Sequence, residues 1–74
     1  MENQHQKIKG YRDLTQEEID LMNEVKAEGE RLGQLVDRVS KITDVDLRWV
    51  SIAKTDLQKG VMSLVRSIAR PTTF

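Results

Sequence analysis

The residues best suited to chemistry lie in two short stretches near the ends of the chain. In the first stretch, Tyr11 and Arg12 follow Gly10 and place the single tyrosine beside a cation. An aromatic ring can stack on a base or another flat ring, and an arginine beside it can contact an anion. The alternative for Tyr11 is packing, as an amphipathic plug over the end of a helical pair. The residue types leave both functions open.

The second stretch surrounds the predicted end of a helix near the C-terminus. It holds two cations and two hydroxyls, with a proline among them: Arg66, Arg70, Pro71, Thr72 and Thr73. Such groups can bind phosphates if several copies of the chain converge on a symmetry axis. The alternative is that Arg66 and Arg70 only complement the negative end of the helix dipole.

The sequence does not supply the groups that catalysis requires. His5 is the single histidine and stands in no partner motif, and there is no cysteine. Hydrolysis and group transfer need a nucleophile with a base, paired carboxylates or a metal. The glutamates have the distribution of a solvated helix face, and the glycines form no phosphate-binding fingerprint. We therefore expect no enzyme activity, no metal and no cofactor.

Length and charge limit the kinds of partner. The chain has 74 residues, and its 12 basic residues balance 12 acidic ones. A lone domain this small buries only about 60% of its unfolded surface, so we expect a homo-oligomer. Balanced charge argues against general binding to a DNA or RNA polymer. No segment has the pattern of a signal peptide or a membrane span, which predicts no membrane partner and a cytoplasmic location.

Hydrophobic periodicity predicts a first long helix over residues 15–41. Thr15 can cap this helix while Glu18 reaches back to the same turn, which is the capping-box pattern. The apolar stripe follows three-four spacing: Met22, Val25, Leu32, Val36 and Val39. Gly29 occupies the missing step, and Gly29 and Gly33 are expected to permit a close helix crossing, with a local break as the alternative.

A second long helix is predicted over residues 44–70. Capping residues precede it, beginning at Thr43, and Pro71 ends it. Its apolar stripe has the same spacing: Leu47, Val50, Leu57, Val61, Leu64 and Ile68. Lys54 is the one polar residue at a position of that stripe.

These segments predict one all-α domain over residues 1–74. The short connection makes the two long helices an antiparallel hairpin, preceded by a short helix or arm at residues 1–10 and followed by a tail at residues 71–74. A two-helix hairpin cannot enclose its own core. Further apolar residues lie outside the seam: Leu35, Trp49, Ile52 and Val65. Several hairpins are therefore expected to pack into a helical bundle.

Two long runs carry a resemblance to a known family. The first extends from Tyr11 to Lys26 and reads YRDLTQEEIDLMNEVK; the second begins at Arg48 with RWVSIAKTDLQKG and continues through LVR to the ending RPTTF. Both resemble small phage proteins, the anti-CBASS cyclic-oligonucleotide sponges. The resemblance implies sequestration of cyclic nucleotide second messengers in the cytoplasm of an infected bacterium, without bond cleavage. It also implies a homohexamer of hairpins, each with a short leading helix.

The resemblance further implies which residues contact ligands. Tyr11 matches the base-stacking tyrosine and Lys26 the phosphate-contacting lysine of a cyclic dinucleotide site between protomers, where Arg12 is a further candidate. A separate cyclic trinucleotide site on the symmetry axis is implied to use Arg66, and Arg70 and Thr72 are second candidates because they lie near it in the sequence.

Composition and periodicity alone fit a second function equally well. A structural or adaptor hairpin could use its apolar faces to bind a partner protein. Tyr11 discriminates between the two functions, because a ligand contact and a packing contact respond differently to its removal.

Overall fold

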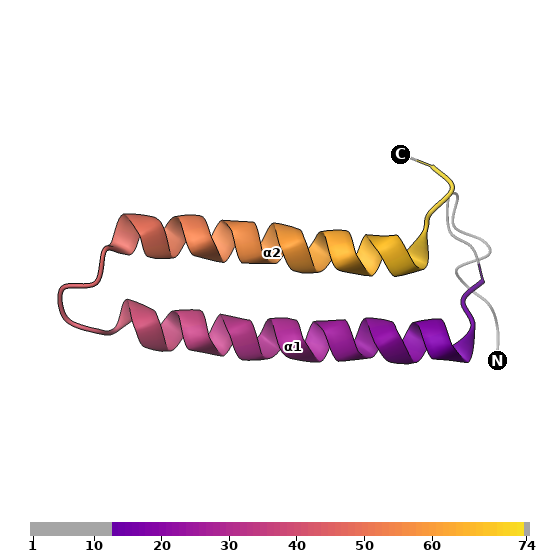
Figure 1. Ribbon diagram of the computed structural model, residues 1–74, viewed down its shortest axis with the longest axis horizontal. Coiled ribbons are helices and arrows are strands. Elements are labelled where there is room, and N and C mark those ends of the chain that lie inside the picture. The colour runs from indigo at the N-terminus through magenta and orange to yellow at the C-terminus, as the bar shows by residue number, and fades with distance from the viewer. Residues whose placement is uncertain (1–12, 74) are drawn as a thin grey trace.

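The structure is a computed structural model in which residues 13–73 are described. Two helices, α1 (Gln16–Ser40) and α2 (Leu47–Ala69), run antiparallel and are joined by a short loop (Figure 1). This arrangement confirms the predicted all-α hairpin of two long helices. The short helix or arm predicted at residues 1–10 lies outside the described residues.

The start of α1 is the capping box that the sequence predicts. The hydroxyl of Thr15 accepts a hydrogen bond from the Glu18 backbone N–H at 3.2 Å, and Glu18 Oε1 accepts one from the Thr15 backbone N–H at 2.9 Å. Two backbone donors that the first helical turn leaves without partners are thereby satisfied. A cap of this kind stabilises a helix by about 1 kcal/mol.

The start of α2 differs from the prediction, because the helix begins at Leu47 and not at residue 44. Asp44 has φ 68°, a left-handed conformation that a right-handed helix does not contain. Asp46 is the N-cap, and its Oδ1 accepts hydrogen bonds from the backbone N–H groups of Arg48 at 3.0 Å and Trp49 at 3.3 Å. The helix therefore begins three residues later than the predicted segment.

Gly29 marks the close approach of the two helices. A Cβ atom placed on Gly29 would lie 3.2 Å from Val61 Cγ1, which is tighter than most contacts of that kind. This confirms the predicted close crossing at Gly29. The same expectation is wrong for Gly33 within the hairpin, because a Cβ atom there would meet nothing within 4 Å.

The apolar seam of α2 also differs from the prediction, because Leu47 and Leu64 are 60% and 53% exposed. Val61 and Val65 are half-buried, whereas Leu64 is 53% exposed. Residues three and four positions after Val61 both lie near its face of the helix, so periodicity alone does not choose between them. The packing against α1 selects Val65, and Leu64 lies outside the seam.

The hairpin does not enclose a core of its own. None of the described residues is fully buried, and the exposed large apolar residues extend along both helices and the loop. They are Ile19, Leu21, Leu35, Ile42, Leu47, Trp49, Leu57, Met62 and Leu64. The prediction that two helices cannot bury their apolar surface without further partners is confirmed for this part of the chain.

Candidate functional site

The predicted ligand residues fall into three groups in the structure. Arg66, Arg70 and Thr72 lie together at the end of the hairpin where α1 begins and α2 ends, which we call the terminal end (Figure 1). Lys26 lies within α1, ten residues after Gln16 and therefore about 15 Å along the helix axis. Tyr11 and Arg12 lie outside the described residues, two positions and one position before Asp13 in the sequence.

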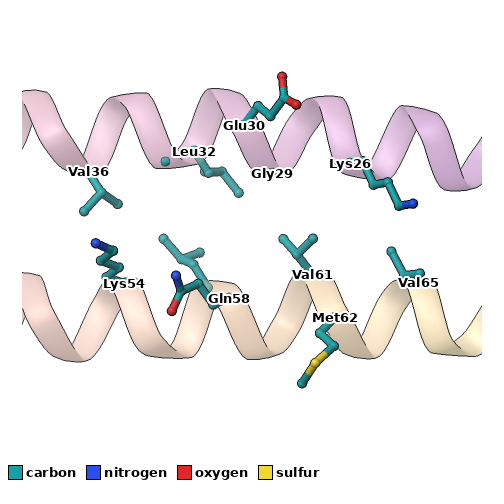
Figure 2. A pocket seen from close by; sticks show the side chains of 12 residues that line it. Lys26, Gly29, Glu30, Leu32, Val36, Lys54, Gln58, Val61, Met62 and Val65 are labelled. Carbon is teal, nitrogen blue, oxygen red and sulfur yellow. The ribbon is translucent and has the colours of Figure 1, made fainter.

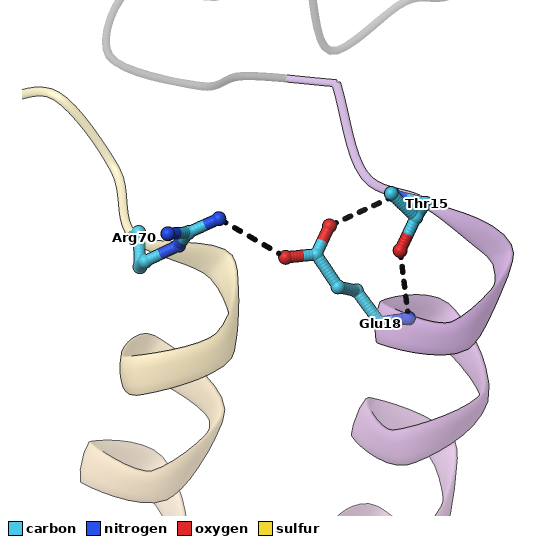
Figure 3. Close-up of polar contacts among 3 residues, drawn as sticks. All are labelled: Thr15, Glu18 and Arg70. Atoms are coloured by element: carbon cyan, nitrogen blue, oxygen red, sulfur yellow. Dashed lines mark hydrogen bonds and ion pairs between the residues drawn. The ribbon is translucent and has the colours of Figure 1, made fainter.

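An ion pair joins the two helices at the terminal end. Arg70 Nη2 donates a hydrogen bond to Glu18 Oε2 at 3.2 Å, and the two residues are 52 positions apart in the sequence (Figure 3). The Glu18 side chain is only 20% exposed, whereas that of Arg70 is 65% exposed. Charge-assisted hydrogen bonds are stronger than neutral ones, and partial burial reduces their screening by water.

The backbone conformation of Arg70, which belongs to this ion pair, ends α2. Arg70 is the C-cap with φ 44° and ψ 61°, and its N–H donates to the carbonyl of Arg66 at 2.8 Å. A left-handed residue commonly ends a helix in this way, and a proline often follows because it cannot continue the helix. Pro71 follows here and is half-buried.

The C-terminal tail returns towards the last turn of α2. Arg66 Nη2 donates a hydrogen bond to the Thr73 carbonyl at 3.3 Å, while the Thr72 residue between them is exposed. The structure therefore brings the cation and the hydroxyl of the predicted trinucleotide site to one end of the hairpin. Arg66 also lies in the last turn of α2, where a cation is favoured by the helix dipole.

An open groove of about 590 Å³ runs between the two helices. Lys26 and Val65 lie at one end of it, and Lys54 and Val36 lie at the other (Figure 2). The remaining lining residues are mostly apolar: Gly29, Glu30, Leu32, Gly33, Leu57, Gln58, Val61 and Met62. An apolar floor with a lysine at each end suits packing against another apolar surface, with the charged groups left at the margin.

A second hollow, of about 340 Å³, lies next to the loop. Trp49 and Leu35 are among its lining residues and are 59% and 46% exposed. The Arg48 guanidinium lies 5.7 Å from the centre of the Trp49 ring, within the range of a cation–π contact.

On α1, an ion pair between Glu28 and Arg31 raises the pKa of Arg31 through their hydrogen bond and their opposite charges.

Within residues 13–73, no three acidic, histidine or cysteine side chains gather in a group that could hold a metal ion. Neither α1 nor α2 combines the length and the apolar character that a membrane span requires.

Sequence reasoning missed the second contact of Glu18. The three-residue spacing from Thr15 predicted its function in the cap, but that pattern is local and says nothing of Arg70. The signal was present in the topology: antiparallel helices of 25 and 23 residues joined by a short loop bring the first turn of one beside the last turn of the other. A glutamate in that first turn and an arginine after that last turn are then neighbours.

The chain matches the family described as "Acb2/Tad1, hairpin domain" over residues 3–69. The chain belongs to this family. A relative in Pseudomonas phage JBD67, Anti-CBASS protein 2, is 42% identical over 105 aligned positions that cover 96% of this chain and 97% of the relative. The alignment is longer than this 74-residue chain, so the relative has residues without a counterpart here. The resemblance to the anti-CBASS sponges is confirmed.

The range matched by the Acb2/Tad1 hairpin family divides the predicted ligand residues. Tyr11, Lys26 and Arg66 fall within residues 3–69, whereas Arg70 and Thr72 lie beyond that range.

Proposed function

We propose that this chain binds cyclic di- and trinucleotide second messengers and holds them intact, so that bacterial CBASS antiviral signalling is not activated. The observation that carries this proposal is membership of the Acb2/Tad1 hairpin family together with the phage relative named Anti-CBASS protein 2. A stoichiometric trap in the cytoplasm of the infected host requires affinity and abundance, and it requires no catalytic step.

For cyclic dinucleotides, we propose that Tyr11 stacks on a base, Lys26 contacts a phosphate and Arg12 adds a second cation. Stacking contributes about 1–3 kcal/mol per base, and charge-assisted contacts add to it. Lys26 is exposed at the margin of the groove, where its ammonium group can reach a ligand.

For cyclic trinucleotides, we propose a second site at the terminal end. Arg66 is its principal phosphate contact, and Thr72 and Arg70 are further candidates. Support comes from the proximity of all three residues to the end of α2 and from the exposure of Thr72 and Arg70. Three copies arranged around an axis would supply one such set of groups for each of the three phosphates of the ligand.

We propose that the assembly is a homo-oligomer, with six copies as the expected number, in which residues 1–10 form a short helix or arm. The support is the large apolar surface that the hairpin leaves uncovered, including the groove between α1 and α2. Burying that surface between copies would stabilise the fold by about 25 cal/mol for each Å² removed from water.

One experiment tests the function directly. The purified protein is mixed with a panel of cyclic di- and trinucleotides, binding heats are measured by calorimetry, and the complex is then digested with a protease. Chromatography of the digest should recover the intact nucleotide, with fewer than one dinucleotide bound per chain. Absence of heat with every member of the panel would overturn the proposal in favour of an adaptor hairpin, and linear products would show cleavage.

A further inference from the structure

We infer that Glu18 is a positioning residue of the cyclic trinucleotide site at the terminal end. Its carboxylate holds the guanidinium group of Arg70, which then contacts a phosphate of the ligand. This inference rests on the proposed function, in which Arg70 is a further candidate for phosphate binding, and it adds a residue of α1 to a site at the end of α2. The contacts, the exposure and the backbone conformation of these two residues carry it (Figure 3).

The Glu18 carboxylate is fixed at both of its oxygens. Oε1 accepts a hydrogen bond from the Thr15 backbone N–H at 2.9 Å, and Oε2 accepts one from Arg70 Nη2 at 3.2 Å. The first contact belongs to the capping box and ties the carboxylate to the first turn of α1. Arg70 is therefore paired with a group that has a defined place on the other helix, 52 positions away.

The exposures of the two side chains differ in the way that a ligand contact requires. The Glu18 side chain is 20% exposed, whereas that of Arg70 is 65% exposed. A guanidinium group has five N–H donors, and the contact with Glu18 engages Nη2, so other donors can meet a phosphate. An anion that approaches from solvent therefore meets the Arg70 cation before the Glu18 carboxylate.

The backbone of Arg70 indicates that its side chain matters at this position. Arg70 ends α2 with φ 44° and ψ 61°, a left-handed conformation that glycine usually supplies at a helix end, because a Cβ atom is strained there. An exposed ion pair contributes little to stability, so the pair with Glu18 does not by itself account for a strained arginine. Contact of the guanidinium group with a ligand accounts for it.

Contacts within the last turn and the tail hold the neighbouring candidates at the same end. The Arg70 backbone N–H donates to the Arg66 carbonyl at 2.8 Å, and Arg66 Nη2 donates to the Thr73 carbonyl at 3.3 Å. Glu18 links this set of contacts to α1. Ordering the Arg70 guanidinium in the free protein lowers the entropy that its immobilisation costs when a ligand binds.

A competing function for Glu18 makes the opposite prediction. If Glu18 withholds Arg70 from the phosphate, removing the carboxylate charge frees the guanidinium group and tightens binding. If Glu18 positions Arg70, removing the same charge weakens binding. The sign of the change produced by Glu18→Gln therefore separates the two functions.

The variants remove one group at a time and keep the ends of both helices. In Glu18→Gln, glutamine is accepted at the third helical position of a capping box, where its carbonyl oxygen can still bond the Thr15 N–H. Its NH₂ group and the Arg70 guanidinium are both donors, so their contact is lost. Arg70→Gly removes the guanidinium group at a backbone conformation that glycine adopts readily. The matched control is Glu17→Gln, which removes the same charge from the same helical turn at an exposed position.

The experiment measures dissociation constants by calorimetry for the unsubstituted protein, the three single variants and the double variant of Glu18→Gln with Arg70→Gly. The probe is cyclic tri-AMP, or cyclic AMP–AMP–GMP if the unsubstituted protein binds it more tightly. With three copies around the axis, we expect Arg70→Gly to weaken binding about 30-fold, or about threefold for each copy. Glu18→Gln should weaken it about eightfold, or about twofold for each copy. The double variant should be no weaker than Arg70→Gly, and Glu17→Gln should match the unsubstituted protein.

Two further readouts separate positioning from a purely structural function. Arg70→Lys keeps a cation opposite Glu18 and should recover part of the affinity that Arg70→Gly loses. Glu18→Gln should leave the affinity for the most tightly bound cyclic dinucleotide within about twofold, because that site is separate. Circular dichroism and sedimentation should show unchanged helicity and mass for each variant.

Equal trinucleotide binding by Glu18→Gln and Glu17→Gln would overturn the inference, as would tighter binding by Glu18→Gln. Undiminished binding by Arg70→Gly, or a further loss in the double variant, would also overturn it. Loss of helicity or mass in Glu18→Gln, or equal weakening of both ligand classes, would assign Glu18 to the fold alone. If the unsubstituted protein binds no cyclic trinucleotide, the proposed trinucleotide site and this inference are both wrong; any other contrary result leaves the proposed function standing.

Discussion

The two ends of the hairpin are held together by different forces. At the terminal end the helices are not joined by the chain, and the ion pair between Glu18 and Arg70 connects them. At the loop end the backbone itself makes the connection, and large apolar side chains are exposed there, as Ile42 at 61% and Trp49 at 59% illustrate.

The difference suggests a division of function along the molecule. At the terminal end an ion pair links the helices, and the cations and hydroxyls near it, such as Arg66 and Thr72, suit an anionic ligand. At the loop end the backbone links the helices, and the exposed apolar side chains there are available to pack between copies. Four substitutions test this division of function.

Val61 lies in the seam between α1 and α2, against Gly29. Val61→Asp would place a carboxylate without a partner in that close contact, so we expect the free energy of unfolding to fall by about 2–4 kcal/mol. Urea titration followed by circular dichroism measures the change. Ser63→Asp, at an exposed position of the same helix, is the control and should change stability by less than about 0.5 kcal/mol. Equal losses would show that the seam does not support the fold.

Tyr11→Ala tests the proposed stacking of Tyr11 on a base. We expect the dissociation constant for a cyclic dinucleotide to rise about 10- to 100-fold, because stacking on one base is lost, while Tyr11→Phe keeps most of the affinity. Calorimetry gives the constants, and circular dichroism and sedimentation should show unchanged helicity and mass. Loss of helicity or mass in Tyr11→Ala would instead assign Tyr11 to packing over the end of the hairpin.

Trp49→Ala tests whether the loop end packs between copies. Large aromatic residues often dominate subunit interfaces, so we expect the midpoint concentration for dissociation of the oligomer to rise about tenfold. Sedimentation over a range of protein concentrations measures it. Arg48→Ala removes only the neighbouring cation and should have a smaller effect. An unchanged midpoint would mean that Trp49 stays in water in the assembled protein.

Gly33→Ala gives the smallest effect and reports on the groove. In an isolated hairpin, Gly33→Ala and Gly60→Ala should each stabilise the helix by up to about 1 kcal/mol, since a Cβ atom meets nothing within 4 Å at either site. If another copy covers the groove, only Gly60→Ala keeps this gain, and that is our expectation. Thermal unfolding compares the two variants, and equal gains would contradict a covered groove.

The sequence was most informative where the determining interactions are local. The capping box needs only Thr15 and Glu18, three residues apart, and the start of α1 was predictable from them. Family resemblance likewise followed from continuous runs of residues. The alternation of apolar residues predicted two long helices because each stripe repeats within its own helix.

Prediction was less successful where the packing of one segment against another determines the structure. Several residues between Thr43 and Asp46 can cap a helix, and the left-handed conformation of Asp44 eliminates the earlier ones. Leu64 and Val65 both fit the period, and only the approach of α1 selects Val65. The pairing of Glu18 with Arg70 depends on the relative lengths of two helices and a loop, which no pattern within one helix contains.

The position of Trp49 gives the protein an intrinsic optical reporter. It is the only tryptophan of the chain, and the 21 residues from it to Arg70 extend about 30 Å along α2. A nucleotide bound at the terminal end therefore lies too far from this indole to quench its fluorescence by contact within the same chain. The emission maximum should instead shift to shorter wavelength when copies associate, so that assembly can be followed spectroscopically while calorimetry follows the ligand.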